Sequence, residues 1–231
     1  MGPRQEAWFY KQLIRSHKKR HTRWRLIGNQ IVFSTMNVSA LFGPKNPRNY
    51  DAWDGYQANK NRTLATLVNH NISNTIFLSG DSHAAWVSDL VWFGNGDYNT
   101  TTGAGSLGVE FAGSAVSSPS PMGDNVTAFG AAIGSSWLIN NNPELQWQDL
   151  YYRGYYTLDV QYEKVTAAFY GTPQRKSRNG KEIKLAEFEV LDGHNRLRRS
   201  SRGSTVEGGV VYGGILRGGK TKAGQITDTN V

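Results

Sequence analysis

The segment SGDSH at residues 79–83 places an acid and a histidine two positions apart. An apolar run typical of a buried strand leads into it, and in α/β sheets ligands collect where loops leave the carboxyl ends of strands. Carboxylate and imidazole are ligands of zinc, iron and manganese, whereas calcium and magnesium prefer oxygen donors. On an extended backbone, a spacing of two puts both side chains on one side. Asp81 and His83 are therefore candidates for half of a metal site.

The same two residues also have an ordinary structural interpretation. Asp81 could cap a turn by accepting bonds from nearby N–H groups, and His83 could be a hydrogen-bonded core histidine. Gly80 before them would allow a sharp turn or a close approach of the backbone to a phosphate. Spacing alone leaves the metal site and the turn both open, and two ligands do not complete a site that needs at least four. The other histidines lie in a basic run, near a helix end and in a loop: His17, His21, His70 and His194.

Other reaction classes find less support in the residues. The chain has no GxSxG segment and no P-loop lysine motif. The Gly-rich residues 103–108 lack the spacing of a phosphate-binding loop, and the Tyr-rich residues 151–156 are typical of sheet packing rather than base stacking. There is no cysteine, which excludes disulfides and thiolate ligands.

Hydrophobic periodicity predicts helices alternating with strands, as in a layered α/β domain. We expect a domain over residues 1–171 and a basic extension over 172–231, with one strand and a flexible, Gly-rich end. The expected helices cover residues 5–16, 57–70 and 126–142. The expected strands cover residues 23–35, 74–80, 84–92, 108–118, 153–162, 164–171 and 183–191, with a hairpin across residues 162–164.

Charge is unevenly distributed along the 231 residues. Residues 1–48 hold ten Lys and Arg against one acid, residues 49–171 hold four against eleven, and residues 172–231 hold twelve against six. Basic ends of this kind are more typical of a solvated surface than of a nucleic-acid site, whereas an acidic middle suits a polyvalent cation. The sequence predicts no transmembrane segment, and its first residues lack the basic-then-apolar pattern of a signal peptide.

Five Asn-x-Ser/Thr sequons fit a glycoprotein of the secretory route, and fit equally well a coincidence in an Asn-rich chain. They begin at Asn37, Asn61, Asn71, Asn99 and Asn125.

Six segments, in this order, carry a family resemblance that none of them would carry alone: GPRQEAWFYKQL, WRLIGNQIVFS, YDAWDGY, FLSGDSHAAWVSDL, VEFAGSAVSSP and RGYYTLDV. Together they resemble the C-terminal half of the PhoD-like (alkaline phosphatase D) metallophosphatases, in their fungal form. These belong to the calcineurin-like metallophosphoesterase superfamily. The resemblance covers about residues 1–171.

The resemblance implies the C-terminal part of a four-layer α/β/β/α sandwich that hydrolyses small phosphate esters with a multi-metal centre. It implies that Asp81 and His83, in the GDxH motif, are metal ligands, with iron and calcium as the metals and no catalytic residue beyond the ligands. Asp54 and Asn29 stay outside the ligand set, because buried hydrogen bonding explains them equally well. A secreted or cell-surface location is also implied.

The family's N-terminal half carries further acidic and NHD-type ligand motifs, and these have no match in this sequence. The resemblance therefore implies a chain shortened at its N-terminus, with the missing half as a partner. An inactive remnant or interaction module is the alternative, and a polyanion-binding module using the basic ends is a more distant one.

Overall fold

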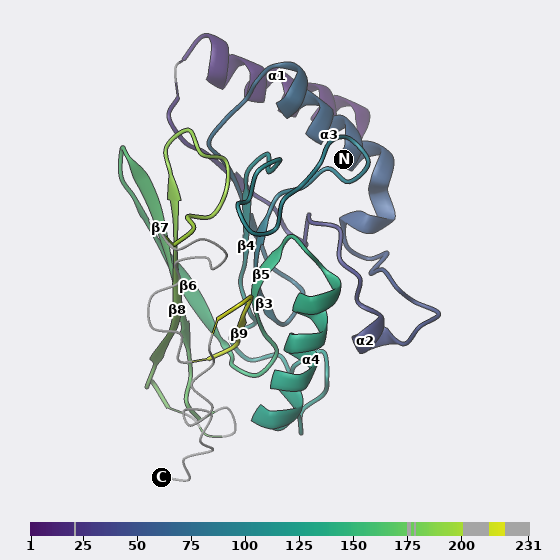
Figure 1. Ribbon diagram of the computed structural model, residues 1–231, viewed down its shortest axis with the longest axis vertical. Helices are drawn as coiled ribbons and strands as arrows, with labels where there is room; N and C mark the ends of the chain where they lie inside the picture. Colours follow the sequence, from purple (N-terminus) through teal and green to yellow (C-terminus); the bar gives the residue numbers. More distant parts are fainter. Residues whose placement is uncertain (21, 175–176, 178, 201–212, 220–231) are drawn as a thin grey trace.

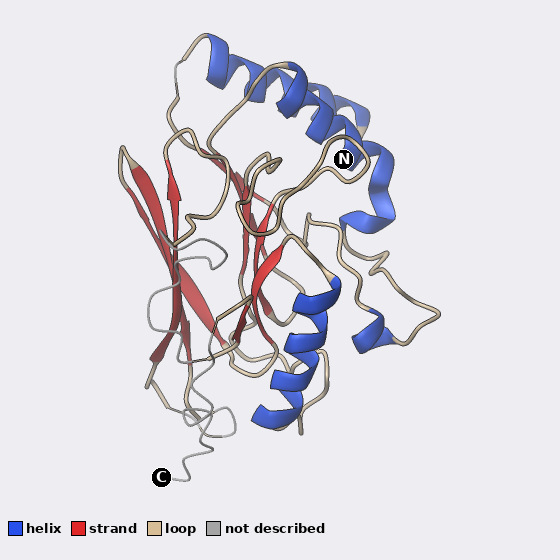
Figure 2. Cartoon of the chain, viewed as in Figure 1, coloured by secondary structure: helices blue, strands red, loops and turns tan. Residues whose placement is uncertain are grey.

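The computed structural model describes residues 1–20, 22–174, 177, 179–200 and 213–219 (Figure 1). A six-stranded mixed sheet carries the helices on one face and a three-stranded antiparallel sheet on the other (Figure 2). The elements in chain order are α1 (Pro3–Lys18), β1 (Arg25–Gly28), α2 (Ser39–Phe42), a 3-10 turn (Trp53–Tyr56), α3 (Gln57–Asn69), β2 (Thr75–Ser79), β3 (Ala85–Asp89), β4 (Val109–Ala112), α4 (Ala128–Asn141), β5 (Leu145–Asp149), β6 (Gly154–Val160), β7 (Lys164–Gly171), β8 (Ile183–Leu191) and β9 (Ile215–Leu216).

The predicted α/β class is confirmed, and the described residues form three layers. The fourth layer of the expected sandwich is not observed among them, because no described helix covers the outer face of β6, β7 and β8 (Figure 2). Nor does the described part of the chain hold a helix with the length and apolar character needed to cross a membrane.

The order of the six-stranded sheet brings two loops together. The strands run β1-β2-β4-β3-β5-β9, and β1, β2 and β4 are parallel to one another. Ser79 at the end of β2 pairs with Ala112 at the end of β4. The loops that begin at Gly80 and Gly113 therefore leave the same edge of the sheet side by side, which is where this topology places a ligand site.

Three apolar clusters hold the layers. The cluster between the sheets contains Phe111, Trp147, Phe169 and Phe188, all 0–2% exposed, and the Trp147 and Phe169 rings lie 5.0 Å apart. A second cluster lies between α4 and the six-stranded sheet, and a third packs α1 and α3 against β2. Aromatic burial of this kind dominates core energetics.

The long helices begin and end as their sequences predict. Pro3 opens α1, where its missing N–H has no partner to lose, Glu6 lies in the first turn, and basic residues lie in the last turn. The Thr127 hydroxyl caps α4 by accepting the Gly130 N–H at 3.0 Å. The predicted helices 5–16, 57–70 and 126–142 are confirmed with small shifts at their ends.

The strand expected over residues 23–35 is wrong after Gly28. Its apolar residues are buried, but buried carboxylates, rather than a neighbouring strand, bind the backbone. The Glu110 carboxylate accepts the N–H groups of Phe33 at 2.7 Å and Ser34 at 2.8 Å, and Asp54 accepts that of Met36 at 3.1 Å. The segment therefore forms a loop over the sheet instead of extending β1.

The described residues after 171 contribute to the packed core. β8, expected from the sequence, pairs along β7 and buries Leu185, Phe188 and Val190. β9, which the sequence did not predict, pairs with β5. Most of the Gly-rich end, residues 201–212 and 220–231, lies outside the described residues, so its flexibility stays a prediction, as does a domain division at residue 171.

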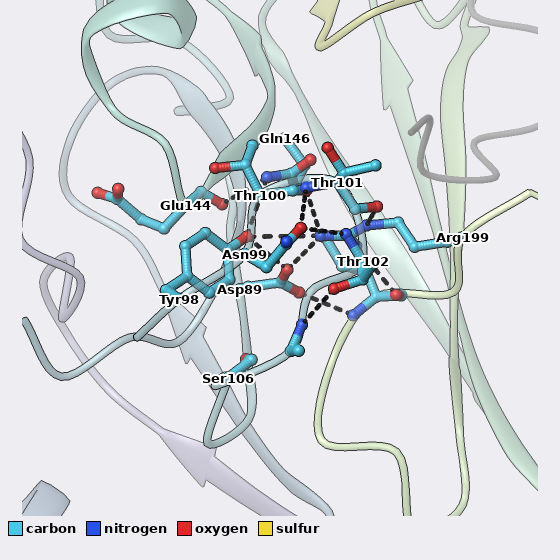
Figure 3. Close-up of polar contacts among 12 residues, drawn as sticks. Asp89, Tyr98, Asn99, Thr100, Thr101, Thr102, Ser106, Glu144, Gln146 and Arg199 are labelled. Atoms are coloured by element: carbon cyan, nitrogen blue, oxygen red, sulfur yellow. Dashed lines mark hydrogen bonds and ion pairs between the residues drawn. The ribbon is translucent and has the colours of Figure 1, made fainter. Parts of the chain in front are cut away.

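A polar network ties the segment after β8 to the six-stranded sheet (Figure 3). Asp89, at the end of β3, accepts bonds from the Tyr98 hydroxyl at 2.8 Å, the Leu197 N–H at 2.8 Å and the Arg199 guanidinium at 2.5 Å. Gln146 donates to the Tyr98 hydroxyl at 3.2 Å. Burial and the Asp89 carboxylate both raise the pKa of Tyr98, so it stays a neutral donor.

Gly154, the first residue of β6, leaves no room for a side chain. A Cβ built there would lie 1.9 Å from the Tyr170 carbonyl oxygen on β7. We expect Gly154→Ala to lower the free energy of unfolding by more than about 2 kcal/mol, because the β6–β7 pair would have to separate. Urea unfolding measures this. Gly180→Ala, where a Cβ would meet nothing within 4 Å, is the matched control. If Gly154→Ala and Gly180→Ala lowered the free energy of unfolding equally, the close approach of Gly154 to the Tyr170 carbonyl would not be what stabilises the β6–β7 pair.

Candidate metal centre

Asp81 and His83 lie in a tight turn at the end of β2. Their φ angles are 67° and 55°, and the Ser82 N–H donates to the Gly80 carbonyl at 2.8 Å. The assumption of an extended backbone between them is therefore wrong. Two residues other than glycine in the left-handed region within three positions is a strained arrangement, of the kind that clusters at functional sites.

Both side chains nevertheless line one open cavity, about 420 Å³ in volume. Asp81 is exposed and His83 is half-buried. Three segments form the walls: the turn after β2, the loop after β4 and the start of β6. The lining residues are Ser79, Gly80, Asp81, His83, Gly113, Ser114, Ala115, Val116, Gly154, Tyr155 and Tyr156. The turn thus brings together the two residues that the sequence singled out.

The His83 ring is oriented by a carbonyl oxygen. Its Nδ1 lies 3.1 Å from the Pro119 oxygen, in the loop after β4. Because a carbonyl oxygen only accepts, this bond requires the proton on Nδ1 and leaves the lone pair on Nε2. Histidines that bind metals are commonly held this way, with one ring nitrogen donating to the protein and the other free to bind.

Ser82 and Gly80 have structural rather than chemical roles in the turn. The Ser82 hydroxyl accepts the Trp86 indole N–H at 2.7 Å and donates to the Ala84 carbonyl at 3.1 Å, which holds the turn against the start of β3. A Cβ at Gly80 would meet only the Gln30 carbonyl, at 3.7 Å. No contact within the protein therefore requires glycine at this position, whereas the sharp turn expected there is present, with the Gly80 carbonyl accepting the Ser82 N–H.

Asn29 and Asp54 are committed to bonds within the protein. The Asn29 amide accepts the Trp53 indole N–H at 2.9 Å and donates to the Ser79 hydroxyl at 3.1 Å. Asp54, 3% exposed, forms a 3.0 Å ion pair with the equally buried Lys60. Burial lowers the pKa of Lys60, and the Asp54 charge opposes this shift. Both residues thus have the hydrogen-bonding roles that the sequence allowed them, Asp54 buried and Asn29 half-buried, consistent with leaving them outside the ligand set.

The rest of a metal site is not found among the described residues. They contain no group of three or more His, Cys, Asp or Glu side chains that could hold an ion. His17 lies in the last turn of α1, His70 follows α3 and His194 follows β8, whereas His21 lies outside the described residues. Asp81 and His83 therefore offer two of the positions that a metal ion would need.

Sequence reasoning missed the residues of the opposite wall. Tyr155 stacks on Tyr170 at 5.4 Å and Tyr156 on Phe169 at 5.0 Å, which is the sheet packing expected of alternating tyrosines. The two also line the cavity, because Gly154 follows directly on the loop that faces His83. The sequence predicted the hairpin that holds these tyrosines, but it did not indicate that the start of the hairpin lies beside the turn after β2.

Comparison with known proteins places the chain in a family. It is 27% identical to alkaline phosphatase D of Bacillus subtilis (strain 168) over 209 residues, which cover 90% of this chain and 33% of that protein. A solved structure described as "Structure of PhoD" superimposes with a TM-score of 0.68 at 25% identity, covering 87% of this chain and 35% of the other. The chain thus spans about a third of the length of each relative. The family model described as PhoD-like phosphatase matches residues 1–169, and the chain belongs to that family.

Proposed function

We propose that the chain supplies Asp81 and His83 to the metal centre of a phosphatase that hydrolyses small phosphate esters. The observation that carries the proposal is the turn after β2, which directs a carboxylate and an imidazole with a free Nε2 into one cavity. Membership of the PhoD-like family supports the reaction class. Phosphate monoesters are the first substrates to try, with diesters after them.

The donor set fits the metals that the family resemblance implies. An exposed carboxylate and a neutral imidazole suit iron, and the carboxylate alone suits calcium. When bound, such ions would act as Lewis acids toward the phosphate oxygens. The part of this chain is to hold the two donors in place. Asp81 offers oxygen, and His83, with its proton held on Nδ1 by Pro119, offers Nε2.

We propose that the remaining ligands come from a further polypeptide, equivalent to the other two thirds of the relatives, in the same protein or as a partner. The surface suited to it is the free edge of the six-stranded sheet. Leu26 and Gly28 of β1 are exposed there, beside a groove of about 800 Å³ between α1 and β1 in which Trp8 is 59% exposed. An uncovered strand edge of this kind is prone to pair with another strand.

A secreted or cell-surface location is proposed from the family resemblance and the sequons. Four of the five sequon asparagines are exposed, and Asn37 is half-buried with its side-chain oxygen bonded to Ser39. Treatment of the protein from its natural source with an N-glycosidase tests the assignment: a fall in mass supports it, and an unchanged mass argues against it.

Metal binding tests the role of the two ligands. We expect Asp81→Ala and His83→Ala each to weaken binding of Mn²⁺ at least tenfold, because each removes one of two donors in the cavity. Paramagnetic broadening of the resonances of the cavity residues that remain in each variant measures this. Asp124→Ala and His194→Ala, outside the cavity lining, are matched controls.

Hydrolysis of nitrophenyl phosphate with added Fe³⁺ and Ca²⁺ measures the reaction itself. If the chain hydrolyses nothing and the two ligand variants bind metal as the unaltered protein does, the phosphatase proposal fails for this polypeptide. An inactive remnant would then be the better description.

A further inference from the structure

Arg153 is a buried cation beside the candidate metal centre. It lies in the turn between β5 and β6 and is only 4% exposed. A guanidinium is expensive to bury, because its five N–H donors must all exchange water for protein partners. Its position in the fold therefore calls for an explanation that the sequence did not provide.

One terminal nitrogen of Arg153 binds two main-chain carbonyl oxygens, that of His83 itself and that of the residue before Pro119. Nη1 donates to the carbonyl oxygen of His83 at 2.6 Å and to that of Ser118 at 3.2 Å. Ser118 directly precedes Pro119, whose carbonyl accepts the His83 Nδ1 proton. The same nitrogen thus contacts the main chain of the candidate ligand and the main chain next to its ring partner.

The other terminal nitrogen anchors the guanidinium to its own turn. Nη2 donates to the Leu150 carbonyl at 3.2 Å and to the Tyr151 carbonyl at 3.4 Å. Two further bonds join the same turn to the loop after β4: the Ser114 hydroxyl donates to the Tyr152 carbonyl at 3.0 Å, and the Gly154 N–H donates to the Ala115 carbonyl at 3.1 Å. Arg153 therefore joins the turn after β2, the loop after β4 and the turn after β5 at a point beyond the last paired residues of these strands.

We propose that Arg153 is a positioning residue that fixes the orientation of the His83 ring. By holding the His83 carbonyl and the Ser118–Pro119 loop at once, it keeps the Pro119 oxygen in line with Nδ1, so that Nε2 faces the cavity. A lysine cannot replace it, because a single ammonium group lacks the planar fork that reaches carbonyls on opposite sides. The consequence for metal affinity rests on the proposed function, whereas the orientation of the ring does not.

The tautomer of His83 tests the positioning role directly. In the unaltered chain, at about pH 8.5 where a free imidazole is neutral, ring ¹⁵N shifts should show the proton on Nδ1. In Arg153→Lys we expect the population to shift toward the Nε2-protonated form, because the Pro119 oxygen loses its fixed place. We expect binding of Mn²⁺, followed by paramagnetic broadening, to weaken about tenfold, as is typical when a hydrogen-bond partner behind a metal ligand is lost.

Two controls separate orientation from stability. Arg62→Lys changes an exposed arginine that pairs with Glu6, and should leave the His83 tautomer unchanged. Leu64→Ala removes a core side chain from the α1–α3 cluster, and should destabilise the fold while leaving the tautomer unchanged. Loss of the Nδ1 form in Leu64→Ala would show that the tautomer only follows stability, and would overturn the proposal.

The remaining outcomes are also decisive. An unchanged tautomer in a folded Arg153→Lys overturns the positioning role. If Arg153→Lys does not fold, Arg153→Gln, which keeps an amide donor, takes its place. If neither folds at 10 °C, Arg153 is a folding residue and the assignment is withdrawn. A tautomer that responds to Arg153 in a chain that binds no Mn²⁺ would support the positioning role and contradict the proposed function.

Discussion

Replacing Arg199 with methionine is expected to lower the free energy of unfolding by about 3–5 kcal/mol, because it leaves a buried carboxylate without its counter-charge. Asp89 is fully buried, and the Arg199 guanidinium, 9% exposed, binds it at 2.5 Å. Burial raises the pKa of Asp89, and the charge of Arg199 opposes this shift. The Leu197 N–H and the Tyr98 hydroxyl still bind the carboxylate in the variant, but neither carries charge. Urea unfolding at about pH 7 measures the loss.

A double variant separates the stranded charge from the lost packing. Asp89→Asn combined with Arg199→Met should be more stable than Arg199→Met alone, because the buried group is then neutral. Arg198→Met is the matched control. Its side chain is 42% exposed in an ion pair with Glu189, so its removal should cost less than about 1 kcal/mol. Equal losses for Arg198→Met and Arg199→Met would contradict the role given to the buried pair.

Replacing Glu144 with glutamine is expected to stabilise the protein by about 3 kcal/mol at pH 8.5 and by close to nothing at pH 4. Glu144 is 1% exposed, and neither carboxylate oxygen has a hydrogen-bond partner among the described residues. Its side chain points away from the network around Asp89 (Figure 3). Burial raises its pKa from 4.5 to about 7.

The direction of this pH dependence follows from proton binding. Below pH 4.5 the folded and unfolded chains both hold the proton on Glu144, so the residue does not alter the balance between them. Between pH 4.5 and 7 the unfolded chain ionises first, so the stability of the folded protein falls as pH rises, and the loss is complete above about 7. Glutamine has no such proton to lose, so the difference in free energy of unfolding between the variant and the unaltered protein grows from pH 4.5 to about 7.

Thermal and urea unfolding across pH 4 to 9 measure the difference. Glu163→Gln, on the exposed turn between β6 and β7, is the matched control, and should change stability by less than about 0.5 kcal/mol at every pH. A difference between Glu144→Gln and the unaltered protein that stays flat with pH would show that Glu144 is solvated or paired in solution.

Elements with a clear hydrophobic pattern could be predicted from the sequence. β2, with its apolar run Ile76–Leu78, and the hairpin of β6 and β7 were both found where expected. No strand was expected at β5, although Leu145 and Trp147 alternate with Gln146 and Gln148 as in a half-buried strand. The structure buries all four side chains, which that pattern does not indicate. A polar side chain buried by tertiary structure leaves no signal in a hydrophobic pattern.

The candidate site was predictable in its residues and not in its geometry. Asp81 and His83 could be chosen from their chemistry and their place after a strand. Their left-handed backbone could not be read from a sequence without glycine at either position. Arg153 begins the matching segment RGYYTLDV, but its contact with His83 joins residues 70 positions apart, and only the folded chain brings them together.

The ion pair between Arg199 and Asp89 shows that the family-model match and the packed core end at different places in the chain. The family match ends at residue 169, whereas the partner of a buried charge at the end of β3 comes 30 residues later. β8, which closes the core between the sheets, also lies beyond the match. The family-model match and cooperative folding therefore have different limits in this protein. Sequence drift after residue 169 is restricted by the need to keep one cation and one apolar strand in register with residues that precede it.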